Sequence, residues 1–171
     1  MTPSTSRVLT HPLAFIGGGN MARSLIGGLI KRGADPSRIR VAEPNEPLRA
    51  ALAADFGVQV FTEAGEAAYG ADTWLFAVKP QVMRTVCESL APMAQAQRPL
   101  VVSIAAGITV VQMQRWLGGG VPVVRSMPNT PALLGAGARP RAVAFLGVEV
   151  QARRGVGGAR RLDGGLGGKE I

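Results

Sequence analysis

Short apolar runs alternate with longer segments of helical period along most of the chain. These runs have the length of buried strands and are bounded by turn residues or charges. They cover residues 13–16, 39–42, 58–61, 73–78, 100–104 and 121–125. Strands that alternate with helices are typical of βαβ units, which build a parallel sheet. The pattern therefore predicts an α/β fold with a doubly wound parallel sheet.

The segments between these runs carry apolar residues on one helical face. In the first of them, apolar residues recur every four positions from Met21 to Ile30, and Gly33 provides a stop. In the third, Pro80 is expected to open the helix and Pro92 to close it. The predicted helices are residues 21–30, 48–56, 82–90 and 110–117, with a weaker alanine-rich one at 63–69.

The first predicted strand runs directly into a glycine-rich turn. Gly17, Gly19 and Ala22 fit the pattern G-x-G-x-x-G/A between a strand and a helix. Gly17 permits a tight turn, Gly19 removes a side chain where a pyrophosphate must approach the backbone, and Ala22 lets the helix pack closely on the strand. Free amides at the helix N-terminus would bind the phosphate. The segment predicts a Rossmann domain that binds a dinucleotide.

The end of the second predicted strand is the place where such domains distinguish NADH from NADPH. Glu43 would repel a 2′-phosphate if it pointed inward, whereas Asn45 and Arg49 could receive one. Glu43 could equally be a solvated loop acid. Both interpretations remain open at the level of sequence.

Three further loops follow predicted strands and would lie at the same edge of the sheet, where open α/β folds bind ligands. Lys79 stands between an apolar strand and a helix-starting proline. The segment 103–108 offers small residues that let a ligand approach the backbone, although the same residues also suit tight packing. In residues 125–132, two prolines stiffen a loop with hydrogen-bonding side chains.

Charge and composition narrow the function classes. The net charge of +8 is uneven: residues 1–138 hold twelve Lys or Arg and eight Asp or Glu, whereas residues 139–171 hold seven and three. Half of the net charge thus lies in residues 139–171 and not on the predicted domain, which disfavours a nucleic-acid partner for that domain. Cys87 alone cannot form an intrachain disulfide, no cluster has metal-ligand spacing, and no apolar run is long enough for a membrane span. A cytoplasmic protein without a metal or a membrane partner is expected.

Four segments, in order, closely resemble pyrroline-5-carboxylate reductases: residues 15–22, 77–81, 103–108 and 125–138. The resemblance implies reduction of the small molecule 1-pyrroline-5-carboxylate to L-proline with NADP(H), which is favoured, or NAD(H). No general acid is identifiable among these residues, so the catalytic residues are left unassigned. An alternative is a fragment or sensor that binds a dinucleotide without turnover.

The resemblance also implies roles for individual residues. Those expected at the cofactor are Gly17, Gly18, Gly19, Asn20, Met21, Ala22, Ala77, Val78, Lys79, Pro80, Ala105, Ala106 and Gly107. The position at the end of the second predicted strand adds Glu43 and Asn45. Those expected beside the substrate are Met127, Pro128, Asn129 and Thr130. Ala64 stands where the family often has an Asn at the adenosine side of the cofactor.

The expected organisation is a flexible N-terminal tail (1–11), an NAD(P)-binding Rossmann domain (12–138) and an anomalous tail (139–171). Family members continue into a helical domain that forms a homo-oligomer and completes the substrate pocket, but residues 139–171 share no pattern with it. This tail is Gly- and Arg-rich and is expected to be poorly ordered. Its composition suggests a frameshift near Ala138; a genuine short variant with a basic tail is the alternative.

Overall fold

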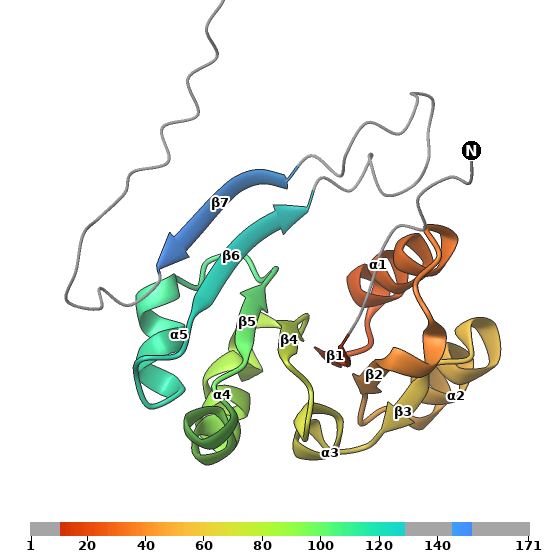
Figure 1. Ribbon diagram of the computed structural model, residues 1–171, viewed down its shortest axis with the longest axis horizontal. Helices are drawn as coiled ribbons and strands as arrows, with labels where there is room; N and C mark the ends of the chain where they lie inside the picture. Colours follow the sequence, from red (N-terminus) through yellow and green to blue (C-terminus); the bar gives the residue numbers. More distant parts are fainter. Residues whose placement is uncertain (1–10, 129–144, 152–171) are drawn as a thin grey trace, which may run out of the picture.

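A computed structural model describes residues 11–128 and 145–151 of the chain. In chain order the elements are β1 (Leu13–Ile16), α1 (Asn20–Lys31), η1 (Pro36–Arg38), β2 (Ile39–Ala42), α2 (Glu46–Phe56), β3 (Gln59–Phe61), α3 (Ala64–Ala68), β4 (Thr73–Phe76), α4 (Pro80–Gln97), β5 (Leu100–Ser103), α5 (Val110–Trp116), β6 (Val123–Pro128) and β7 (Phe145–Gln151). The strands form one sheet in the order β3-β2-β1-β4-β5-β6-β7 (Figure 1). The first six are parallel and form the doubly wound sheet that the sequence predicts.

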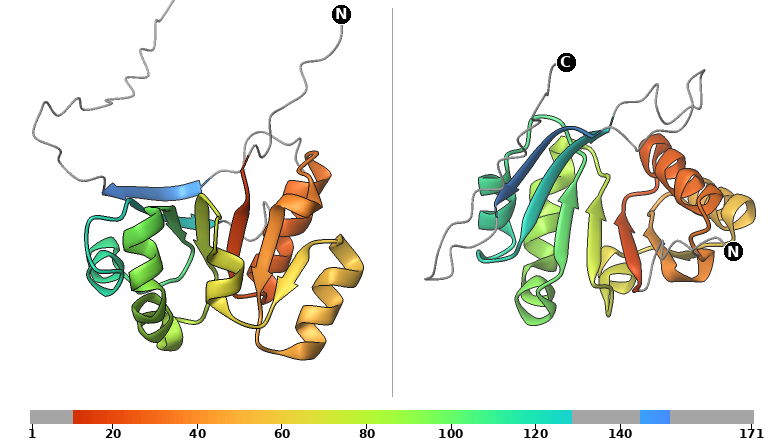
Figure 2. Two further views of the ribbon diagram at one scale, coloured as in Figure 1. Left: turned by 60° about the horizontal axis from the view of Figure 1, so that its bottom comes forward. Right: turned by 45° about the horizontal axis from the view of Figure 1, so that its top comes forward.

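Two apolar cores lie on opposite faces of the sheet (Figure 2). One gathers side chains of α1 and α2 over β1 and β2, with Phe15 and Ile26 fully buried. The other packs α3, α4 and α5 against the opposite face, around Trp74 and Phe76. Buried strands with apolar residues on both faces are what a parallel sheet covered on both sides requires.

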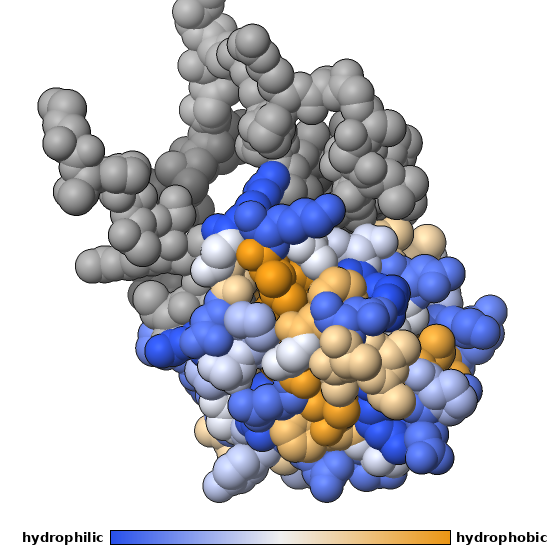
Figure 3. Space-filling view, turned by 90° about the vertical axis from the view of Figure 1, so that its right-hand side faces the viewer, coloured by the Kyte–Doolittle hydropathy of each residue, from blue (hydrophilic) through white to orange (hydrophobic). Residues whose placement is uncertain are grey.

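The two faces are covered unequally. Leu75 packs against the α1–α2 core, and the register places Val102 and Val124 beside it on that face. All three are only partly buried, because α1 and α2 lie mainly over β1 and β2. Figure 3 shows the side of the molecule that carries α1 and α2, where apolar and charged side chains are mixed.

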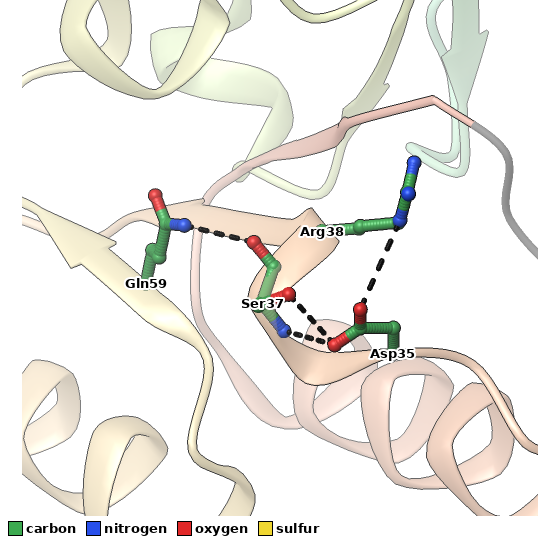
Figure 4. Close-up of polar contacts among 4 residues, drawn as sticks. All are labelled: Asp35, Ser37, Arg38 and Gln59. Atoms are coloured by element: carbon green, nitrogen blue, oxygen red, sulfur yellow. Dashed lines mark hydrogen bonds and ion pairs between the residues drawn. The ribbon is translucent and has the colours of Figure 1, made fainter.

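A short capped turn leads into β2. The Asp35 carboxylate accepts hydrogen bonds from the amide and the hydroxyl of Ser37, at 2.9 and 2.7 Å, which caps η1 (Figure 4). Gln59 at the start of β3 donates to the carbonyl of Ser37 at 2.8 Å. The bond from Gln59 ties the turn before β2 to the start of the neighbouring strand β3.

Most predicted boundaries agree with the structure to within about two residues, and two ends differ by more, for physical reasons. α4 does not close at Pro92 but continues to Gln97. Its last turn is held by the fully buried Ala94 and by Gln95, whose amide donates to the carbonyls of Leu117 and Gly119 at 2.7 and 2.8 Å. These contacts offset the hydrogen bond that a helix loses at proline.

The second difference lies at the end of the sheet. β6 begins at Val123 and runs to Pro128, beyond the predicted 121–125, because β7 pairs with it antiparallel. β7 lies inside the segment 139–171, where the sequence predicts no element. One piece of that segment therefore belongs to the sheet.

Candidate functional site

The carboxyl ends of β1, β2 and β4 meet at one edge of the sheet through backbone hydrogen bonds. The amide of Gly17 donates to the carbonyl of Ala42 at 2.9 Å, and the amide of Ala77 donates to the carbonyl of Ile16 at 2.8 Å. β5 joins through the amide of Ile104, which donates to the carbonyl of Phe76 at 3.2 Å. The loops singled out in the sequence after these strands are therefore neighbours.

Gly17 brings the first two motifs into direct contact. Its φ is +104°, and a Cβ at this position would lie 2.8 Å from the carbonyl oxygen of Ala77 and 3.1 Å from Cγ1 of Val78. Neither the dihedral angle nor the space allows a side chain. The tight turn predicted at Gly17 is thus observed, and its partner is the loop after β4.

Gly19 and Ala22 form the other side of the turn. A Cβ at Gly19 would meet nothing within 4 Å, so the backbone there faces open space. Gly19 is the N-cap of α1 and provides no side-chain cap, which leaves the first amides of the helix available to an anion. Ala22 is fully buried, as close packing of α1 on the sheet requires. Asn20 is exposed and Met21 partly buried in the same first turn.

Glu43 is not the solvated loop acid that the sequence allowed. It is 8% exposed. Its Oε2 accepts a hydrogen bond from the amide of Gly18, and its Oε1 accepts one from the amide of Asn45, both at 2.9 Å. The carboxylate therefore points inward, toward the glycine-rich loop.

The start of α2 carries a cation close to the loop after Glu43. Arg49 donates from Nη1 to the carbonyls of Glu43 and Pro44, at 2.8 and 3.2 Å. Asn45 uses its Oδ1 to cap α2 by accepting from the amide of Leu48 at 3.1 Å. The polar groups proposed for a 2′-phosphate thus lie where β2 passes into α2, next to the buried acid, with Asn45 as the N-cap and Arg49 inside the helix.

The loop after β4 leads into α4. Lys79 is the N-cap of this helix, is exposed and makes no side-chain cap hydrogen bond, and Pro80 occupies the first turn. Ala77 and Val78 are partly buried. Their backbone lies against Gly17, so Lys79 is placed within the same edge.

The loop after β5 is small and turned outward. Ser103 is fully buried, and its Oγ accepts a hydrogen bond from the amide of Ala105 at 3.3 Å. Ala106 and Gly107 are exposed, and Gly107 has a φ of +77°. The sequence did not identify Ser103 as the residue that shapes this turn; its polarity at the end of an apolar strand was the available signal.

The fourth motif is described only in part. Met127 and Pro128 lie at the end of β6 in the backbone. Asn129 and Thr130 lie outside the described residues. Ala64 opens α3 and packs partly buried against the core, so it offers no polar contact of the kind the family's Asn would.

The described ranges also bear on metal binding and on membrane spans. Among residues 11–128 and 145–151, no three His, Cys, Asp or Glu side chains gather as a metal site would need. Within the same ranges no helix has both the length and the apolar character to cross a membrane.

The strand order and the glycine-rich turn define a Rossmann-type α/β domain, and the comparisons place it in a family. The profile of the family described as "NADP oxidoreductase coenzyme F420-dependent" matches residues 12–107. The chain therefore belongs to this family of nicotinamide-dependent oxidoreductases.

Within that class the chain is similar to pyrroline-5-carboxylate reductases. It is 49% identical to the enzyme of Pseudomonas aeruginosa over 129 residues, which are 75% of this chain and 47% of the relative. The structure of the Coxiella burnetii enzyme matches with a TM-score of 0.71 and 38% identity, over 74% of this chain and 47% of that one. The Plasmodium falciparum enzyme, solved with NADP bound, shares the fold at a TM-score of 0.63 and 24% identity, over 74% and 45%. The chain spans about half the length of the relatives it matches.

Proposed function

We propose that this protein binds NAD(P)H and takes part in the reduction of 1-pyrroline-5-carboxylate to L-proline. The observation that carries the proposal is the contact between the loops after β1 and β4: Gly17 lies against Ala77 and Val78. Two motifs that are 60 residues apart thus form one surface beside the free N-terminus of α1. The similarity to pyrroline-5-carboxylate reductases supports the choice of substrate.

The residues that would hold the dinucleotide fit its chemistry. The amides of Gly19, Asn20 and Met21 would bind the pyrophosphate, because the start of α1 lacks a side-chain cap. Ala77 to Pro80 would also hold the cofactor, and Ala105 to Gly107 would lie by the nicotinamide. When bound, the cofactor supplies the hydride, and the chain contributes binding and orientation. Met127 to Thr130 would border the substrate.

NADP(H) is the proposed cofactor and NAD(H) the alternative. Both carboxylate oxygens of Glu43 accept hydrogen bonds from backbone amides, which reduces the acid's repulsion of a 2′-phosphate. The guanidinium of Arg49, from the start of α2, donates to the carbonyl of Glu43. Dissociation constants for NADPH and NADH, measured with Arg49→Gln, test this: we expect NADPH binding to weaken and NADH binding to stay the same. Equal weakening of both would refute a phosphate contact.

Activity is tested by NADPH oxidation with 1-pyrroline-5-carboxylate, followed by absorbance against a control without substrate. Turnover by the purified chain supports the full proposal. Binding of NADPH without turnover supports the second candidate, a dinucleotide-binding protein without catalysis. The second candidate rests on the same contact of Gly17 with Ala77 and Val78, which concerns binding of the cofactor and not turnover.

The division at Ala138 and a cytoplasmic location are further proposals. The coding DNA tests the division at Ala138: if no alternative frame downstream encodes a Ser-Gly-Ser-Gly-Pro-like segment in a helical pattern, the frameshift hypothesis fails.

The proposed cytoplasmic location fits the cysteine content, because a reducing compartment would keep the single Cys87 as a free thiol. Fractionation of cells that express the chain checks it.

A further inference from the structure

The Glu43 carboxylate links the two loops between which it lies. One oxygen accepts from the amide of Gly18 and the other from the amide of Asn45, both at 2.9 Å. Hydrogen bonds to a charged acceptor are stronger than neutral ones, and burial makes their loss more costly. The acid at the end of β2 therefore joins the glycine-rich loop to the β2–α2 loop.

The carbon atoms of Glu43 hold the same loop by packing. A Cβ at Gly18 would lie 2.9 Å from Cβ of Glu43 and 2.6 Å from Cδ1 of Leu52, so the backbone of residue 18 rests on both side chains. Gly19, one residue later, has open space instead. The amide of Gly18 is thus turned inward, while the next residues face outward.

We propose that Glu43 is a positioning residue that holds the glycine-rich loop in the shape that binds the dinucleotide pyrophosphate. The inference rests on the proposed dinucleotide binding. Because NADH and NADPH share the pyrophosphate, loss of Glu43 weakens the binding of both by the same factor. An acid that bound the ribose hydroxyls would affect NADH alone, and one that repelled the 2′-phosphate would strengthen NADPH binding when removed.

The test is a fluorescence titration of the full chain with NADPH and with NADH, without substrate. Glu43→Ala is expected to weaken the binding of both dinucleotides by roughly tenfold. Glu43→Gln keeps one acceptor oxygen, so it is expected to weaken binding less than Glu43→Ala does, and by the same factor for NADPH as for NADH. Glu46→Gln is the matched control, because it removes the same charge from the exposed first turn of α2. It is expected to leave both constants within about twofold of the wild type.

Three titration results would overturn the proposal: loss of NADH binding alone, a gain in NADPH binding, or no change in either. Hydrogen exchange of the Gly18 amide gives a readout without ligand. We expect this amide to be protected in the wild type and to exchange faster in Glu43→Ala, while the amide of Phe15 in β1 keeps its protection. If the amides of Gly18 and Phe15 both exchange faster, the alanine variant has lost its fold. The same comparison in Glu43→Gln then tests the positioning role.

The same measurements separate this inference from the proposed function. A wild-type chain that binds neither dinucleotide refutes the proposed function even if Gly18 is protected. If the chain binds NADPH but the Gly18 amide is unprotected, only the positioning role of Glu43 is refuted, and the proposed function stands.

Discussion

The carbonyl oxygen of Ala77 occupies the space that a side chain at Gly17 would need. A Cβ at residue 17 would lie 2.8 Å from it, a distance that real Cβ atoms essentially never show. Because the obstacle is backbone, it cannot move aside as a flexible side chain could. The turn after β1 and the turn after β4 are therefore built as one unit.

Gly17→Ala and Gly19→Ala should separate folding from binding. We expect Gly17→Ala to lower the free energy of unfolding by more than about 2 kcal/mol, since it combines a clash with a positive φ. Gly19→Ala has open space and should cost at most about 1 kcal/mol, the difference at an N-cap, yet weaken NADPH binding roughly tenfold. Denaturant unfolding and NADPH titration measure the two effects. Wild-type affinity in Gly19→Ala would remove Gly19 from the proposed pyrophosphate site.

Asp35 should contribute stability that depends on pH. Its pKa is lowered from 3.8, first by the hydrogen bond from the Ser37 hydroxyl, then by the Ser37 amide and by the charge of Arg38. A lowered folded-state pKa means that the contribution is complete above 3.8 and is lost as the pH falls through the folded value. Carboxyl chemical shifts across an acid titration measure this pKa.

Asp35→Asn provides the control for that prediction. It should remove this part of the acid dependence of unfolding, whereas Glu46→Gln, at an exposed residue of α2, should leave it in place. An Asp35 that titrates at or above 3.8 would contradict the hydrogen bonds to Ser37.

Cys87 should be unreactive in the folded protein. Burial raises the pKa of its thiol to about 12, with a smaller contribution from the charge of Glu88. A thiol-specific disulfide reagent at neutral pH should label Cys87 only after unfolding, because the thiolate is the reactive form. Rapid labelling under native conditions would show that α4 opens readily.

The same shift predicts alkaline destabilisation. A raised folded-state pKa means that the stability from the protonated thiol is complete below the ordinary value of 9.0 and is lost as the pH rises toward about 12. Cys87→Ala should remove this component of the pH profile, which thermal unfolding at several alkaline pH values measures.

Two buried serines at the carboxyl edge should respond oppositely to alanine. Ser126 is 3% exposed, and its hydroxyl has no hydrogen-bond partner among the described residues. Ser126→Ala should leave Tm unchanged or raise it by a few degrees, since it removes an unsatisfied polar group. Ser103→Ala should lower stability by about 1 kcal/mol, because it removes the acceptor of the Ala105 amide. A Tm loss in Ser126→Ala would reveal a partner for this hydroxyl.

The local sequence pattern was sufficient to predict an element wherever one short segment contains the residues that define it. The predicted bounds of β1 and β2 coincide with the observed strands, because both are apolar runs bounded by turn residues. The tight turn at Gly17 was likewise predictable, since only glycine suits it. The end of α4 was not, because Pro92 is a local stop signal that contacts of Gln95 with residues after α5 override.

The sequence by itself determined the doubly wound sheet and the position of the motif loops after its strands, because strand and helix periods and glycine turns are short-range properties. Only the tertiary structure decided which of these loops touch and what Glu43 does. The two orientations considered for Glu43 differ by a rotation of its side chain, and the choice depends on the Gly18 amide, 25 residues away in the chain. Burial selects the inward orientation, because a carboxylate removed from water needs hydrogen-bond donors, and the glycine-rich loop provides one of them.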